Sequence, residues 1–178
     1  MTLAAAYVAQ AVFLALVAGL LLADSRLLRS VRRSGLAGVV LAGSAVALLG
    51  WHLWHLPEPD LAGFPRLPVT VIFVGAGLAA FVWMPDLIAV RGLGALMLFL
   101  ARACLDAGWM RLPDSLLCAA VSYALLIIPG LWWAASPGAF ATHVDWVLAT
   151  SGRRGVIGGA LGLVAIACAL AAWGVPAA

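Results

Sequence analysis

The chain has 178 residues, of which 66% are hydrophobic and 10% are charged, and it contains no lysine. Water-soluble domains carry about a quarter charged residues and about half apolar ones. This composition, with a mean hydropathy of +1.14, therefore excludes a water-soluble globule, a disordered chain and a collagen-like chain. One helical crossing of a membrane takes about 20 residues, so the length allows at most about seven or eight spans.

Six apolar segments follow one another, and we predict one all-α transmembrane bundle over residues 1–178. Each segment is close to the length that crosses about 30 Å of hydrocarbon at about 1.5 Å per residue. The first is predicted to be a membrane helix, because it is longer than the apolar region of a secretory signal and lacks its basic start. The fourth is the weakest, since Arg91, Arg102 and Asp106 interrupt it, and without it the count is five. The segments are 3–23, 35–56, 67–84, 88–109, 116–135 and 156–173.

Arginine is unevenly divided between the connections. Seven arginines follow the first, third and fifth segments, whereas two follow the second and fourth. Because positive charge is retained in the cytoplasm, we expect both termini outside, in the periplasm. The richness in Ala, Leu, Val, Gly and Arg without lysine is typical of a GC-rich bacterial genome, so the predicted location is a bacterial inner membrane. The inner arginines are Arg26, Arg29, Arg32, Arg33, Arg91, Arg153 and Arg154, and the outer ones are Arg66 and Arg111.

The inner connections each begin with residues that favour the start of a helix, such as a capping residue or proline. This pattern predicts three hairpins, each with a short interfacial helix on the cytoplasmic side, over 24–31, 84–88 and 136–151. In the third connection one side is predicted to face lipid and the other water. The lipid side is Phe140, Val144, Val147 and Leu148, and the water side is His143 and Asp145. Arginine, glycine and a helix closing on tryptophan recur three times, which indicates either a threefold repeat or the common form of outward-crossing helices.

Small residues predict where helices pack closely, because lipid supplies no hydrophobic drive between helices. The last segment has two overlapping G-x-x-x-G patterns, formed by Gly155, Gly158, Gly159 and Gly162. Further packing positions are Ala5, Ala9, Ala11 and Ala15 in the first segment, Gly35, Gly38 and Gly43 in the second, and Gly92 and Gly94 in the fourth. The Pro129–Gly130 pair is expected to kink the fifth segment.

The cysteines and histidines offer little metal chemistry. Cys104, Cys118 and Cys168 lie far apart in apolar runs with no C-x-x-C motif, so we expect buried small hydrophobes. His52 and His55 are three positions apart and within reach of Glu58 and Asp60. They are weak candidates for a metal site, and the simpler interpretation is an amphipathic helix end at the interface; no metal or other cofactor is predicted.

Arg102 and Asp106 form the second candidate site. They are one helical turn apart within an apolar segment, so the two side chains can meet. Charges inside a membrane are costly, and we therefore expect this face to turn toward the bundle interior or a partner subunit. The pair, with Asp86 and Arg91 nearby, either seals an interface or takes part in transport or proton handling.

The sequence shows no catalytic motif, and without lysine it can form no retinal Schiff base, so we expect no enzyme. Its arginines sit at helix ends, which favours membrane lipids over nucleic acid as partners. We expect a small accessory or structural subunit that packs against other membrane subunits or itself. One alternative is a small transporter or substrate-binding protein. Six helices in this length, with Ala-x-x-x-Ala on the first, resemble the vitamin-binding subunits of energy-coupling transporters, whose termini lie in the cytoplasm. Another alternative is haem- or quinone-linked electron transfer, although His143 lies near the opposite face from His52 and His55.

Overall fold

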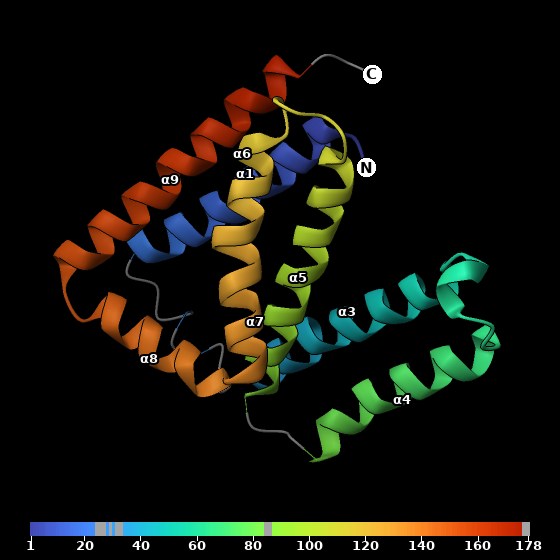
Figure 1. The fold of residues 1–178 in the computed structure, drawn as a ribbon. Coiled ribbons are helices and arrows are strands. Elements are labelled where there is room, and N and C mark those ends of the chain that lie inside the picture. The colour runs from blue at the N-terminus through green and yellow to red at the C-terminus, as the bar shows by residue number, and fades with distance from the viewer. Residues whose placement is uncertain (24–27, 29, 31–33, 84–86, 176–178) are drawn as a thin grey trace.

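The computed structural model describes residues 1–23, 28, 30, 34–83 and 87–175, and these residues form helices and connections without any strand. The all-α class is thus confirmed for this part of the chain. Figure 1 shows the elements, which are α1 (Leu3–Leu22), α3 (Gly35–Trp54), η2 (Glu58–Leu61), α4 (Arg66–Trp83), α5 (Ile88–Gly108), α6 (Leu116–Val121), η3 (Ser122–Ile127), α7 (Ile128–Ala135), α8 (Pro137–Leu148) and α9 (Ser151–Gly174). Outside the described residues lie Arg26, Arg29, Arg32, Arg33 and Asp86, and with them the first predicted interfacial segment almost entirely and most of the second.

Side-chain caps set the start of three long helices. Thr2, Ser34 and Thr150 each accept a hydrogen bond from the backbone N–H three residues further on. Such a cap satisfies one of the first N–H groups of a helix, which have no partner within it. The Thr150 cap lets α9 begin at Ser151, five residues before the apolar segment that marked it in the sequence.

Five helices are long and apolar enough to cross a membrane: α1, α3, α5, the continuous helix 116–135, and α9. Six spans are not confirmed, and α4, whose apolar part is Arg66–Ala80, is the shorter helix. The weak fourth segment is instead a full-length helix, α5. Its charges Arg91, Arg102 and Asp106 lie toward the two ends and leave ten uncharged residues, 92–101, between them.

Ahead of the Pro129–Gly130 pair, where a kink is expected from the sequence, the helix has a wider turn. Helix 116–135 is α-helical in α6, π-helical over η3, and α-helical again in α7. Proline has no N–H to donate, and its ring clashes with the carbonyl four residues earlier in a regular helix. A π-helical stretch opens the turn just ahead of the ring, and the helix continues.

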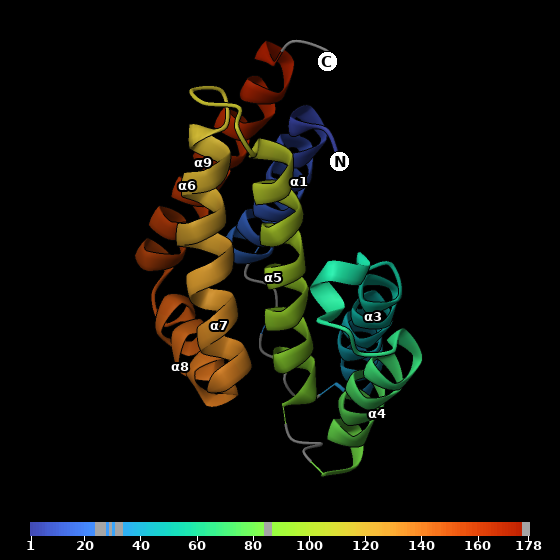
Figure 2. The same ribbon diagram turned by 45° about the vertical axis from the view of Figure 1, so that its right-hand side comes forward.

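The helices in contact are not the pairs that three consecutive hairpins would form, so the predicted hairpin topology is not confirmed. The most extensive contact joins α1 with α9, from opposite ends of the chain, and α5 lies between α3 and α7. Figure 2 shows α3 and α4 standing to one side of the other helices and meeting them along α5. The first turn of α1 and the last turn of α9 lie at the same end of the molecule (Figure 1).

Glycines permit the closest helix approaches, and only part of the predicted set does so. A Cβ on Gly92 would overlap the backbone of Ala42, and a Cβ on Gly94 would lie 2.6 Å from the Gly130 carbonyl oxygen. The packing role of Gly92 and Gly94 is therefore confirmed. Among the other predicted positions, Gly38 lies against Ile88, whereas Gly35 and Gly43 have open space beside them.

Within this chain, one of the four glycines in the predicted G-x-x-x-G patterns packs closely, and contact of the other three with another chain stays a prediction. A Cβ on Gly158 would lie 2.9 Å from the Leu22 side chain, but Gly155, Gly159 and Gly162 have no atom within 4 Å of that position. The reason is that α9 packs through one stripe at helical spacing that runs on from Gly158. The other buried members of this stripe are Ala165, Cys168 and Ala172.

The third interfacial segment is a helix, α8, but its predicted lipid side is partly wrong. Phe140 and Leu148 are buried in the protein, because α8 folds back against α7 and α9. Phe140 packs edge-to-face on Trp133 with ring centroids 5.0 Å apart. His143 is half-buried instead of facing water, and its Nδ1 accepts a hydrogen bond from Trp133 Nε1 at 3.2 Å.

Candidate functional site

The candidate site lies between α3 and α5, which run in the same direction. Gly38 lies against Ile88, Gly92 against Ala42, and His52 is bonded to Arg102. The members of each pair are separated by fifty positions, so the two helices advance together in one register. The backbones touch at Gly92, and toward the later ends of the helices open grooves separate them.

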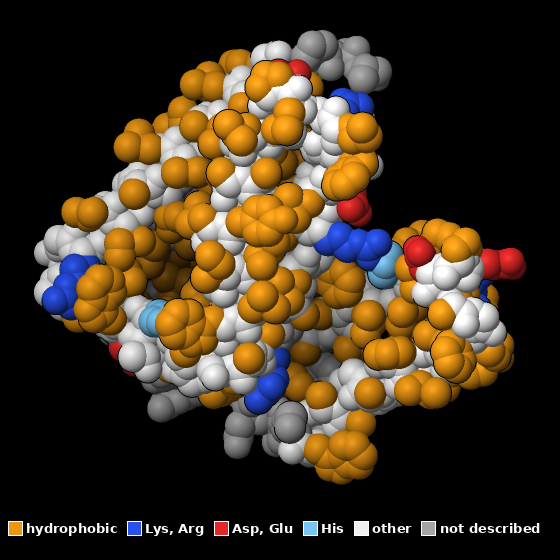
Figure 3. Space-filling model, viewed as in Figure 1, with side chains coloured by type: hydrophobic (Ala, Val, Ile, Leu, Met, Phe, Trp, Pro, Cys, Tyr) orange, Lys and Arg blue, Asp and Glu red, His pale blue; other side chains and the backbone are white. Residues whose placement is uncertain are grey.

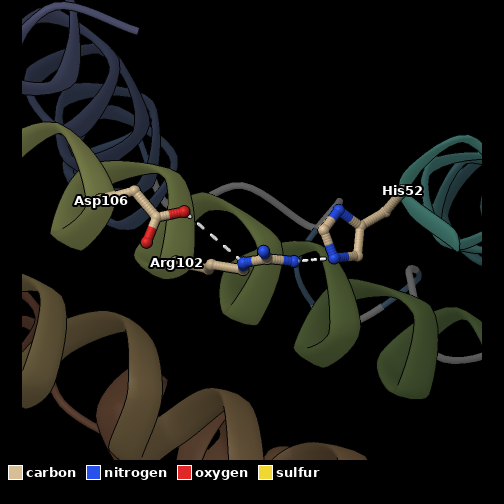
Figure 4. A network of polar contacts seen from close by, with 3 residues as sticks. All are labelled: His52, Arg102 and Asp106. Carbon is tan, nitrogen blue, oxygen red and sulfur yellow. Dashed lines mark hydrogen bonds and ion pairs between the residues drawn. The ribbon is translucent and has the colours of Figure 1, made fainter. Parts of the chain in front are cut away.

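Three polar side chains bridge this opening, and we call them the His52–Arg102–Asp106 cluster (Figure 4). Arg102 Nε lies 3.5 Å from Asp106 Oδ2, as expected for positions one turn apart on a helix. Arg102 Nη1 donates a hydrogen bond to His52 Nε2 on the facing helix. Since a guanidinium only donates, His52 Nε2 is an acceptor, and the ring is neutral with its proton on Nδ1.

The cluster is exposed at the surface of the protein. The side chain of Arg102 is 49% exposed and that of Asp106 is 69% exposed. Figure 3 shows charged and histidine colours together on an otherwise mostly apolar face between α5 and α3. The pair therefore does not lie in the bundle interior, which was one of the two predicted environments, and a partner subunit stays a prediction.

Arg102 lies at different distances from the ends of the two helices that it joins. Six residues of α5 follow Arg102, a rise of about 9 Å. However, His52 is only two residues from the end of α3, beside Trp51 and Trp54. Tryptophans of this kind favour the membrane–water interface. The cluster is therefore level with the tryptophan-bearing end of α3, although α5 continues beyond it.

Two apolar grooves meet at Arg102. The first groove has a volume of about 440 Å³ and the second about 430 Å³, and both are lined by Phe99 and Arg102. The other residues of the first groove are Ala45, Val46, Leu49, Ala95 and Leu98. The second groove adds His52 and Asp106 to apolar side chains that include Leu48, Leu96 and Leu100. One charged cluster thus stands at the junction of two apolar clefts.

The two histidines of α3 do not form the metal site considered from the sequence. His55 Nδ1 lies 2.8 Å from the Trp51 carbonyl oxygen, and its ring stacks on Trp51 with centroids 4.0 Å apart. His52 is bonded to Arg102 instead. Within the described ranges, no three His, Cys, Asp or Glu side chains are grouped so that they could hold a metal ion.

No family model, curated protein or solved structure matches this chain.

A second polar cluster is buried where α1 meets α6 and η3, and sequence reasoning missed it. Gln10 is fully buried, and its Nε2 donates hydrogen bonds of 2.9 Å to the Cys118 carbonyl and to Ser122 Oγ. The Tyr7 hydroxyl donates to the Asp114 carbonyl at 2.6 Å and accepts from the Cys118 N–H at 3.3 Å. The signal in the sequence is the single glutamine inside an otherwise apolar first segment.

The three cysteines, far apart in sequence, belong to one buried hydrophobic cluster. Each thiol donates a weak hydrogen bond, Cys104 to the Ala6 carbonyl, Cys118 to the Cys104 carbonyl, and Cys168 to Gln10 Oε1, at 3.7–3.9 Å. All three are free thiols. Their burial agrees with the predicted role as small hydrophobes, and together with Gln10 they fix α1 against α5, α6 and α9.

Proposed function

We propose that this chain is a six-span accessory subunit of a larger membrane complex, and that α3 and α4 form an arm which packs against another membrane subunit. The observation that carries the proposal is the attachment of this arm. All extensive contacts between this arm and the remaining helices join α3 with α5. Along the described side chains of α4, 66–80 and 83, none is buried.

The direction of the helices supports a sixth span. Because α3 and α5 run the same way, the chain must return across the same thickness between Trp54 and Ile88. The helix in that interval long enough to make the return is α4, whose 18 residues rise about 27 Å. The arginine distribution then supports a bacterial inner membrane with both termini in the periplasm.

The outward face of α4 supports a protein partner. α4 meets α3 through Val74 and Gly77, which lie against Gly50 and Val46. The opposite side carries Ile72, 66% exposed. Beside it Gly75 has no atom within 4 Å of a Cβ position. Helices in lipid associate where small residues let backbones approach, so this face suits a second helix.

Site-specific photo-crosslinking in native membranes tests the proposal. A benzophenone amino acid at Ile72 is expected to give one protein adduct of defined mass above 18.4 kDa. The same residue at Leu163, 70% exposed on α9 and away from its packing stripe, is the matched control and is expected to label lipid. Lipid labelling alone at Ile72, equal protein adducts at both positions, or an adduct of twice the chain mass would each contradict a separate partner subunit on the arm.

Of the alternatives, a substrate-binding membrane protein is the second candidate, because the grooves at Arg102 offer a site. The electron-transfer alternative has less support. Of the described histidines, His52 on α3 is bonded to Arg102, His55 caps the end of α3, and His143 on α8 is bonded to Trp133. They therefore do not supply facing ligands for a haem.

A further inference from the structure

We propose that the opening between α3 and α5 binds one zwitterionic phospholipid, with its phosphate on Arg102, its ammonium group on Asp106, and its acyl chains in the two grooves. This inference concerns the inner side of the arm and does not depend on a protein partner at α4. It is carried by the charge of the cluster, by the shape of the clefts, and by their position at the end of α3.

The charge of the cluster selects the headgroup. Arg102 contributes one positive charge, Asp106 one negative charge, and His52 is neutral because its Nε2 accepts a hydrogen bond. An anionic headgroup would approach Asp106 unfavourably, and a cationic one would approach Arg102 unfavourably. A headgroup with both charges satisfies both side chains.

Both side chains keep hydrogen-bonding capacity for such a headgroup. A guanidinium has five N–H donors, and the contacts of Arg102 within the described chain involve Nε and Nη1. The carboxylate of Asp106 meets Arg102 through Oδ2, which leaves Oδ1 as a further acceptor. Arginine is well suited to phosphate because its planar fork matches two oxygens.

The size and lining of the clefts suit acyl chains. Their volumes of about 440 and 430 Å³ lie in the range of small-ligand sites. Two clefts with mostly apolar linings that share Phe99 and Arg102 match two chains that diverge from one headgroup.

The position along the helices fits a lipid as well. The cluster is level with the last turn of α3, where Trp51 borders the second groove. Tryptophan favours the headgroup level of a bilayer. The first groove runs from Arg102 back toward Ala45, away from this end, which is the direction of acyl chains from a headgroup.

Native mass spectrometry of the purified full chain with defined lipids tests the proposal. Phosphatidylethanolamine and phosphatidylglycerol with identical acyl chains are titrated together. We expect the wild type to retain the zwitterionic lipid about three- to tenfold better, which corresponds to one charge-assisted contact of about 1 kcal/mol. Equal binding, or a preference for the anionic lipid, would overturn the proposal.

Variants separate headgroup recognition from the folding of the protein. In Asp106→Asn the site carries a net positive charge, so the preference is expected to reverse toward phosphatidylglycerol. The ratio of two lipids bound in one sample does not depend on the folded fraction. Asp114→Asn, an exposed carboxylate in the connection after α5, is the matched control and is expected to keep the wild-type order. An unchanged order in Asp106→Asn would refute the assignment of the ammonium group.

A groove variant tests the chain positions. Ala95→Phe fills the first groove and is expected to reduce binding of both lipids at least about threefold without changing their order. Ala160→Phe, on the exposed side of α9, is the size-matched control. Equal lipid retention in Ala95→Phe and Ala160→Phe would show that the first groove does not hold an acyl chain.

Discussion

Replacing Gly92 by alanine tests the contact that joins the arm to the rest of the protein. The added Cβ would lie 2.6 Å from Ala42 Cα and 2.7 Å from the Leu41 carbonyl carbon. Carbon atoms in good contact are about 3.5–4.0 Å apart, so α3 and α5 would have to separate by roughly 1 Å. The obstructing atoms are backbone, which cannot turn aside as a side chain can.

Overpacking of this kind costs about 1–3 kcal/mol, and the backbone contact places Gly92→Ala toward the upper end. With about 2–4 °C per kcal/mol for a chain of this size, a cost of about 2–3 kcal/mol is expected to lower the melting temperature in mild detergent, followed by tryptophan fluorescence, by about 4–12 °C. Gly155→Ala on α9, where the Cβ meets open space, is the control and is expected to melt at or above the wild-type temperature. If both variants match the wild type, the parallel contact between α3 and α5 is wrong.

Three further predictions use the same melting assay. Gly158→Leu, which places a side chain against Leu22, is expected to lower stability by about 1–3 kcal/mol and Gly159→Leu to leave it unchanged; equal effects would contradict the packing stripe of α9. Gln10→Ala removes two buried amide hydrogen bonds and one weak bond from the Cys168 thiol and leaves a cavity, so we expect a loss of about 1–3 kcal/mol, and a silent substitution would show that the buried cluster does not hold α1. Asp106→Asn is expected to cost at most about 1 kcal/mol of folding free energy, because the ion pair is exposed. The double change Arg102→Leu with Asp106→Leu is expected to cost less, since only the single change leaves a cation without its carboxylate. The reverse order would show that Asp106 does not compensate Arg102.

Helix positions were largely predictable from the sequence, because they depend on local properties. Apolar runs of membrane length, bounded by proline, glycine or charge, marked α1, α3, α5 and the helix 116–135 to within about two residues at most ends. The larger difference, at the start of α9, comes from the Thr150 cap. A hydroxyl cap extends a helix beyond its apolar run and leaves no trace in hydropathy.

Helix partners were not predictable in the same way. The contact between α1 and α9 includes long-range features such as Gln10, whose Oε1 accepts a weak hydrogen bond from the Cys168 thiol of α9. A count of small residues indicates that a helix packs closely, but it does not say which face does so. Gly158 and Gly159 are adjacent, yet only Gly158 is buried.

In the candidate site, too, the local contact was predictable from the sequence and the long-range contact was not. The contact between Arg102 and Asp106 follows from their i, i+4 spacing within one helix. The contact of Arg102 with His52 was not predicted, and the sequence suggested His52 only as a weak metal ligand. This contact depends on the register of α3 against α5. That register is set by backbone contact at Gly92, and no spacing within the sequence reveals it.

The location of the two termini tests the central claim most directly, because it decides whether α4 returns the chain across the membrane between α3 and α5. Topology reporters that are active on only one side of the membrane are fused separately before Met1 and after Ala178, with a third in the connection between α5 and α6. Six spans predict that all three report the periplasmic side. Termini on opposite sides would show that α4 does not cross, and would contradict both the parallel course of α3 and α5 and the arm built on it.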